Sequence, residues 1–187
     1  MNGNGRNELQ AAAPVSTQEL TLVSKDTQDL DPSFVVGLGA SAGGLEALET
    51  FFDQMPTDTG MAFIVVQHLS PDYKSLMDEI LRKYTSMPIR EAKHGMKINA
   101  NHIYLTPPRK ILTVLEGRLQ LTDSIPPAAL HLPIDMFFRS LAMAYGTKAV
   151  AVIMSGTGTD GSRGIHDIKE AGGLVIVQDS QSAKFDG

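Results

Sequence analysis

Residues 34–44, which read Phe-Val-Val-Gly-Leu-Gly-Ala-Ser-Ala-Gly-Gly, form an apolar segment that runs directly into a glycine-rich turn. The next segment, residues 45–52, carries apolar side chains at helical spacing. Glycines beside a serine let a strand reverse into a helix, because a larger side chain there would collide with the strand or the helix, and because glycine tolerates positive φ. The segment therefore predicts a strand over 34–38, a tight turn at Ser41 and a helix over 43–53.

The turn matches the nucleophile-elbow pattern G-x-S-x-G, in which a serine lies at the carboxyl end of a strand. The N–H groups at the start of the following helix could stabilise an oxyanion. The same residues also fit G-x-G-x-x-A, a dinucleotide-binding pattern, which requires an acidic residue after the next strand. The next strand, 61–67, ends in Gln67 and is followed by His68, so the acidic residue that dinucleotide binding requires is missing. We therefore favour the nucleophile elbow over nucleotide binding. A glycine turn with no chemical role is the third interpretation.

Four continuous apolar segments alternate with helical patterns along the rest of the chain, which is typical of a parallel sheet covered on both faces. We predict an α/β fold with a mainly parallel, doubly wound sheet, helices on both faces and an antiparallel hairpin at one edge. Ser70-Pro71 is the expected start of the second helix, and Glu116-Gly117 is the expected hairpin turn. The other expected elements are strands near 88–92 and 102–106, hairpin strands 110–115 and 118–122, a helix over 134–145, strand 150–154, a short helix ending at 171 and a buried strand over 174–177.

Composition excludes several classes of protein. The 187 residues contain no cysteine, which removes disulfides, thiol catalysis and cysteine metal sites and is compatible with the cytoplasm. A net charge of −5 does not indicate nucleic-acid binding. No apolar run is long enough for a membrane span, no metal-ligand spacing is present, and no cofactor is indicated. Residues 1–32 are polar and without sustained apolar periodicity, so we expect a flexible leader before a domain over 33–187.

Three of the predicted parallel strands end in polar residues. Ser41 follows the first, His68 follows the second, and Asp160 follows the strand over 150–154. Because the carboxyl ends of parallel strands share one edge of the sheet, these residues should lie on the same rim. Serine, histidine and aspartate supply the nucleophile, the base and the orienting acid of acyl transfer. Each also has a structural interpretation: a hydrogen-bonded histidine for His68, and a turn or helix cap for Asp160.

Five motifs resemble the chemotaxis protein-glutamate methylesterase family (CheB type), in that family's order and at similar spacing over residues 34–187. They are Gly39-Ala-Ser-Ala-Gly-Gly44, Val65-Val-Gln-His68, Tyr104-Leu-Thr-Pro107, Pro133-Ile-Asp135 and Gly156-Thr-Gly-Thr-Asp-Gly161. The resemblance implies hydrolysis of glutamate γ-methyl esters on methyl-accepting chemoreceptors, and often deamidation of receptor glutamines. It matches Ser41 to the nucleophile, His68 to the base and Asp160 to the acid.

The resemblance also implies an oxyanion region at Ala42, Thr157 and Gly158, with Thr157 standing where many members carry methionine. The family's usual receiver domain would not fit within residues 1–32. The chain stops where relatives continue, so we expect a domain truncated at its C-terminus, an exposed apolar patch near 174–177, and a fused methyltransferase beyond Gly187. The alternative function is a catalytically weak regulatory or interaction module in such a signalling fusion.

Overall fold

A computed structural model describes residue 1 and residues 30–41, 44–67, 76–124, 132–154, 156 and 159–183. Within these ranges, six strands form one sheet in the order β3-β4-β2-β1-β7-β8, and every neighbouring pair is parallel. This confirms the parallel sheet. The strands are β1 (Val35–Ala40), β2 (Ala62–Gln67), β3 (Ile89–Glu91), β4 (His102–Leu105), β7 (Ala149–Ile153) and β8 (Leu174–Val177).

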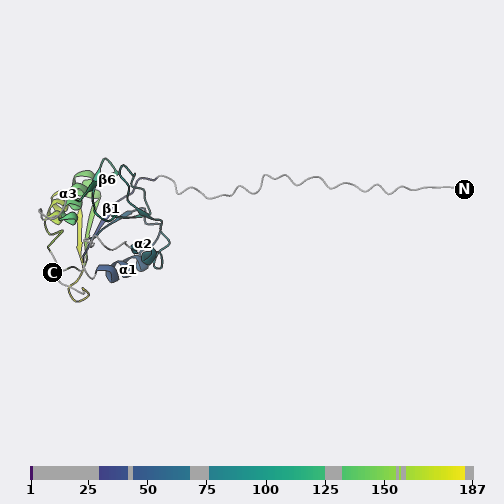
Figure 1. Ribbon diagram of the computed structural model, residues 1–187, viewed down its shortest axis with the longest axis horizontal. Coiled ribbons are helices and arrows are strands. Elements are labelled where there is room, and N and C mark those ends of the chain that lie inside the picture. Colours follow the sequence, from purple (N-terminus) through teal and green to yellow (C-terminus); the bar gives the residue numbers. More distant parts are fainter. Residues whose placement is uncertain are drawn as a thin grey trace.

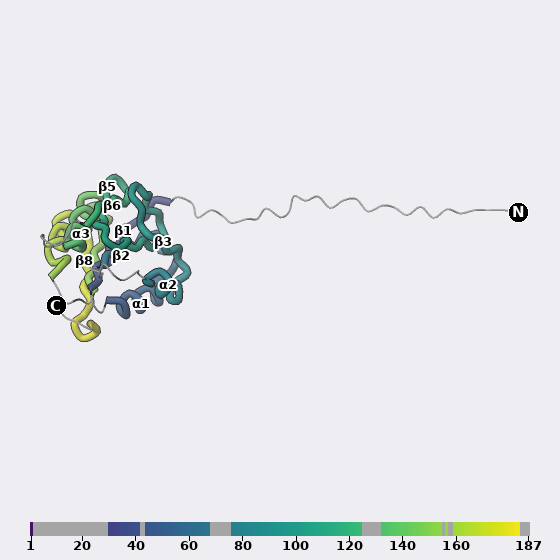
Figure 2. The backbone as a smooth tube through the Cα atoms, in the orientation of Figure 1, coloured from purple at the N-terminus to yellow at the C-terminus, as the bar shows by residue number. Residues whose placement is uncertain are grey.

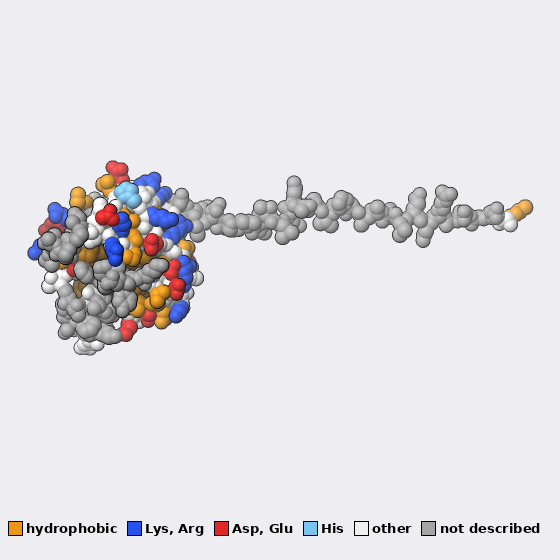
Figure 3. Space-filling model, viewed as in Figure 1, with side chains coloured by type: hydrophobic (Ala, Val, Ile, Leu, Met, Phe, Trp, Pro, Cys, Tyr) orange, Lys and Arg blue, Asp and Glu red, His pale blue; other side chains and the backbone are white. Residues whose placement is uncertain are grey.

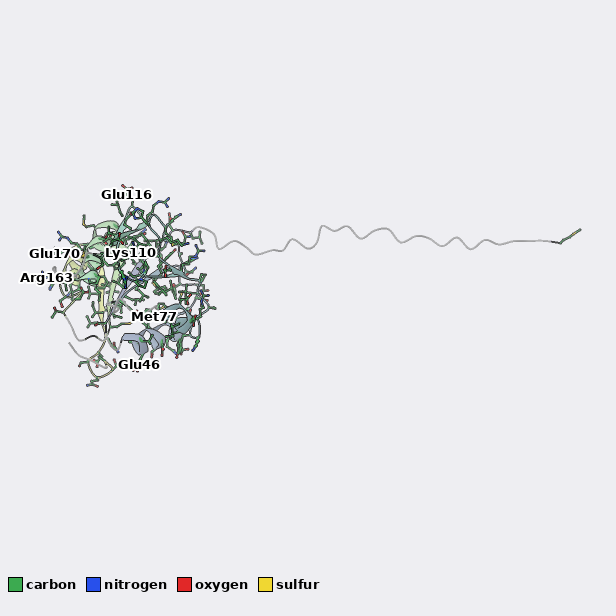
Figure 4. The ribbon with its side chains drawn as sticks, in the orientation of Figure 1. Glu46, Met77, Lys110, Glu116, Arg163 and Glu170 are labelled. Atoms are coloured by element: carbon green, nitrogen blue, oxygen red, sulfur yellow. The ribbon has the colours of Figure 1, made fainter. Side chains whose placement is uncertain are left out.

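Helices cover both faces of this sheet, as the fold class predicts (Figure 1). On one face, α1 (Gly44–Gln54) buries Leu48 and Phe52 in the core, and α2 (Met77–Leu81) buries its first and last residues in the same core. On the other face lie α3 (Pro133–Tyr145) and α4 (Gly164–Glu170), with a 3-10 turn, η1 (Gly146–Lys148), after α3. Glu46 of α1 and Met77 of α2 accordingly lie on the opposite side of the molecule from Glu116 (Figure 4).

The helix expected from Ser70 is only partly described, because the Ser70-Pro71 start lies outside the described residues. Met77 and Leu81 are buried, whereas Leu76 is exposed and precedes α2. Tyr84 follows the helix and donates its hydroxyl to Glu49 Oε2 at 3.2 Å, which joins this segment to α1. That hydrogen bond, together with the charge of Glu49, raises the pKa of Tyr84.

The antiparallel hairpin is present, but it does not extend the main sheet. Strands β5 (Lys110–Leu115) and β6 (Arg118–Asp123) form a separate two-stranded sheet in the described part of the chain, and Arg118 of β6 also forms an isolated antiparallel bridge with Lys97. Figure 2 shows both beside α3, and Val114 N–H donates to Ser140 Oγ of that helix at 3.0 Å. The expected edge position is therefore wrong: the apolar face of the hairpin is buried over α3, where it completes a core that includes Leu112 and Leu119.

Strand β8 is exposed, although we expected a strand buried on both faces. Leu174, Ile176 and Val177 each expose about half of their surface, because among the described strands β8 is the last in the sheet order and has β7 as its one neighbour. An exposed apolar patch at this position was expected, and the structure shows it. Elsewhere, acidic and basic side chains are intermixed on the face seen in Figure 3.

Two glycines of β1 let α3 lie close to the sheet. A Cβ atom on Gly37 would lie 2.7 Å from Phe137 Cε1, and one on Gly39 would lie 2.7 Å from Ile134 Cγ2. Neither distance is tolerated by real side chains. The collision that we expected at Gly39 is therefore with a helix distant in sequence, which packs directly behind the strand that leads to Ser41.

Candidate active site

Ser41 directly follows β1 and is half-buried. Its carbonyl oxygen accepts a hydrogen bond from Gly44 N–H at 3.0 Å, and α1 begins at Gly44. The strand, turn and helix therefore occur in the predicted order, with the serine between the carboxyl end of a strand and the start of a helix of 11 residues. This is the position in which an elbow serine can reach a substrate at the edge of the sheet.

Gly156 lies against Ser41. A Cβ atom at position 156 would be 2.8 Å from Ser41 Cβ and 3.6 Å from Ser41 Oγ. The end of β7 is held beside β1 by a hydrogen bond from Met154 N–H to the Gly39 carbonyl at 2.9 Å. Gly156, which follows β7, is thereby brought into contact with Ser41, and only glycine fits at position 156. Our sequence reasoning did not assign Gly156 to the site, although it begins the Gly-Thr-Gly-Thr-Asp-Gly motif.

The predicted base, His68, lies outside the described residues, as do Ala42, Thr157 and Gly158 of the expected oxyanion region. The described residues before His68 show how β1 and β2 are aligned in the sheet. Gln67, which precedes His68, pairs with Ala40, which precedes Ser41, in the parallel register of β1 and β2. The two strands that lead to the predicted nucleophile and base are therefore neighbours and end level with each other.

Asp160 is held by the first turn of α3. Its Oδ2 accepts from Ile134 N–H at 3.1 Å, and its Oδ1 accepts from Asp135 N–H at 3.0 Å. Helix α3 begins at Pro133, and the side chain of Leu132 before it does not cap the helix. The free N–H groups of the first turn therefore donate to a carboxylate from another segment. Bonds from a helix N-terminus to an ionised carboxylate are strong and fix its orientation. Asp160 does therefore cap a helix, although the helix that it caps, α3, precedes it in the chain.

The residue after Asp160 must be glycine. Gly161 has φ of +99°, and a Cβ atom there would lie 2.7 Å from Ile153 Cδ1 and 3.0 Å from Ile134 Cγ2. Both the backbone conformation and the space exclude a side chain. Ile134 thus packs against Gly39 before the serine and against Gly161 after the aspartate, which ties the two segments to the same end of α3.

One further acidic residue of this region was missed. Asp135 is buried, and its Oδ1 accepts from Arg163 N–H at 2.9 Å and from Gly164 N–H at 2.7 Å. Residues 133–135 served only as a resemblance motif in the sequence. A carboxylate in the first turn of an expected helix, after a proline, was the signal that could have drawn attention to it.

Replacing Gly156 with alanine is expected to lower kcat about 10²-fold, because the new Cβ must displace Ser41 and a misplacement of about 1 Å has effects of that size. The matched control is Gly95→Ala. Gly95 has φ of +77° but open space around its Cβ position, so this change should lower stability and leave kcat unchanged. The measurement is ester hydrolysis with a urea melt of each variant. A Gly156→Ala variant with wild-type kcat would contradict the contact between Gly156 and Ser41.

Among the described residues, no group of three or more His, Cys, Asp and Glu side chains is arranged to hold a metal ion. None of the described helices has both the length and the apolarity needed to cross a membrane.

Comparison with known proteins identifies similar sequences over most of the chain. The family model described as CheB methylesterase matches residues 36–187. The protein-glutamate methylesterase/protein-glutamine glutaminase 2 of Xanthomonas oryzae pv. oryzae (strain MAFF 311018) is 37% identical over 154 residues, which cover 80% of this chain and 42% of that protein. The corresponding protein 4 of Myxococcus xanthus is 34% identical over 150 residues, covering 80% and 42% respectively. The chain therefore spans under half the length of these relatives.

Two other comparisons extend this result. An uncharacterized 104.1 kDa protein of Rhodobacter capsulatus is 43% identical over 111 residues, which cover 59% of this chain and 12% of that protein. The crystal structure of the CheB methylesterase catalytic domain of Thermotoga maritima superposes with a TM-score of 0.74 at 25% identity, covering 84% of this chain and 85% of that one.

Proposed function

We propose, because this chain belongs to the CheB methylesterase family, that it hydrolyses glutamate γ-methyl esters with Ser41 as its nucleophile. The observation that carries the proposal is the contact of Gly156 with Ser41. Gly156 begins the motif of residues 156–161, so its contact with Ser41 supports a site at the predicted nucleophile, and Asp160 of the same motif is anchored on the first turn of α3. The parallel register of β1 and β2, which end level at Ala40 and Gln67, supports His68 as the base.

In the proposed reaction, His68 takes the proton of Ser41 Oγ as that oxygen attacks the ester carbonyl carbon. The tetrahedral intermediate collapses when its C–O bond to the methoxy group breaks, and the methoxy oxygen takes the proton from His68 and leaves as methanol. Water then gives a proton to His68 as its oxygen attacks the carbonyl carbon of the acyl-serine. The C–O bond to Ser41 breaks, Ser41 Oγ takes the proton back from His68, and the glutamate side chain leaves as a carboxylic acid that ionises in water. Asp160 keeps the imidazole in the required tautomer and stabilises its charged form. N–H groups at Ala42, Thr157 and Gly158 are the proposed oxyanion donors.

The substrate that we propose is a methyl-accepting chemoreceptor or a similar signalling protein. The names of the Xanthomonas and Myxococcus relatives include both protein-glutamate methylesterase and protein-glutamine glutaminase, which supports a second activity on glutamine with ammonia as the leaving group. Cytoplasmic action and a methyltransferase within the same polypeptide are further parts of the proposal. The absence of cysteine supports the first, and the match to 12% of a 104.1 kDa protein agrees with the second only in that a similar segment occurs within a much longer polypeptide.

Among the described residues, the contacts of Gly37 and Gly39 do not favour the dinucleotide interpretation of residues 37–42. Gly37 and Gly39 are explained by the close approach of α3, with Phe137 and Ile134 lying where their side chains would be. The glycine pattern thus has a packing reason that requires no bound nucleotide.

The test is covalent labelling by a fluorophosphonate probe, together with methanol release from a methylated chemoreceptor. We expect a single adduct on Ser41 and time-dependent methanol release, because an activated serine reacts with both reagents. Mass spectrometry of the labelled peptide locates the adduct. Labelling without methanol release would favour the weakly catalytic regulatory module, and absence of both would overturn the proposed function.

A further inference from the structure

Asp135 is one of three polar or charged residues that are buried within the described part of the chain, the others being Asn99 and His102. Its relative exposure is 8%, and its Oδ2 has no hydrogen-bond partner among the described residues. Asn99 and His102 lie before and at the start of β4, away from the edge at which Ser41 lies. Burying a charged carboxylate costs free energy. The buried carboxylate of Asp135 beside Asp160 therefore needs an explanation other than general stability.

Asp135 and the segment that carries Asp160 are joined by reciprocal hydrogen bonds. The backbone N–H of Asp135 donates to Asp160 Oδ1 at 3.0 Å. The Asp135 carboxylate in turn accepts from the backbone N–H groups of Arg163 and Gly164, three and four residues after Asp160. Each segment thus supplies a carboxylate to the backbone of the other. Moving the 160–164 turn would break the bonds at both ends.

The two segments are also packed so closely that they have little room to move apart. A Cβ atom on Gly164 would lie 3.0 Å from both the Cα and the carbonyl oxygen of Asp135, and 2.7 Å from Phe138 Cβ. The backbone at Gly164 therefore lies directly on α3 at Asp135. Arg163, which is labelled in Figure 4, is the residue that directly precedes α4.

From these contacts we propose that Asp135 is a positioning residue for Asp160: its carboxylate locks the 160–164 turn and thereby sets the direction in which Asp160 presents its carboxylate to His68. This inference rests on the proposed function, since it assigns Asp135 a role within the Ser41–His68–Asp160 reaction. Asp135 acts through Asp160 and does not touch the ester. Groups that orient a reacting residue typically contribute about 10- to 100-fold to activity.

The test is a double-mutant cycle on kcat, with Asp135→Ala made in the wild type and in Asp160→Ala. In the wild type we expect a loss of about 10- to 100-fold in kcat with little change in KM. In the Asp160→Ala background the same change should cost little more, because the residue that it positions is already gone. Asp135→Asn should recover most of the loss, since an amide oxygen can still accept both N–H bonds.

The control is Asn101→Ala, which removes another loop hydrogen bond, from Gly60 N–H to Asn101 Oδ1 at 2.7 Å, at the opposite edge of the sheet. It should lower the unfolding midpoint without changing kcat when both are assayed well below that midpoint. Equal losses of kcat in the two backgrounds, or a change confined to KM or to stability, would overturn the positioning role and leave the proposed function standing. If Asp135→Ala does not fold, Asp135→Glu completes the same cycle, because its extra methylene displaces the carboxylate. A wild-type chain that neither turns over nor labels would overturn both proposals.

Discussion

Replacing Ser41 with alanine is expected to lower kcat by about 10³-fold or more, because no other group can form the acyl intermediate and only binding and oxyanion contacts remain. Ser41 is half-buried and lies in a turn, so the loss of its hydroxyl should leave the fold intact. The measurement is methanol release from a methylated receptor, with a urea melt to verify that the midpoint is unchanged. Turnover near that of the wild type would exclude Ser41 as the nucleophile.

His68 provides an internal check on this result. His68→Ala is expected to cost a similar factor, and the double variant should be little worse than either single variant, because a nucleophile and its base act as one unit. Asp160→Asn should cost as much or less, through the wrong imidazole tautomer. Losses that multiply in the Ser41–His68 double variant would show that the two residues act independently.

Replacing Phe138 with alanine is expected to lower the free energy of unfolding by about 3–5 kcal/mol, the usual range for an aromatic side chain removed from a core. Phe138 is fully buried, and its atoms lie within 3.3 Å of the Cβ positions that Gly37, Gly39 and Gly164 lack. Those glycines cannot refill the space, so a cavity should remain between α3 and the sheet. Urea unfolding of both proteins measures the difference.

Met143→Ala is the matched control for this change. It removes a large apolar side chain from the same helix, but Met143 is 83% exposed, so the expected change lies within about 0.5 kcal/mol. If Phe138→Ala cost no more than Met143→Ala, the close packing of α3 on β1 would be refuted.

Local sequence patterns predicted most elements to within one or two residues. The strand expected over 34–38 is β1 (Val35–Ala40), the helix expected over 134–145 is α3 (Pro133–Tyr145), and the turn expected at Glu116-Gly117 closes the hairpin. Helical and strand periodicity, proline and glycine act over a few residues, so they are visible in the chain itself. The resemblance to the methylesterase family was confirmed by the family model over residues 36–187.

Positions that depend on the arrangement of elements were predicted less well. The hairpin was expected at a sheet edge but packs on α3, and β8 was expected to be buried but lies at the end of the sheet order. Both outcomes depend on which elements become neighbours. Hydrophobicity identifies a face that must be covered, but it does not identify the element that covers it.

The candidate site divides in the same way. By itself, the sequence determined that Ser41 and Asp160 follow apolar strands, because a glycine turn after such a strand is a local feature. Only the tertiary structure decided that Gly156 contacts Ser41 and that Ile134 packs against Gly39. It likewise decided that the segments of Asp135 and Asp160 are joined by reciprocal hydrogen bonds. These contacts join residues far apart in the chain, and they exist because β1 pairs with β7 and α3 packs across both strands.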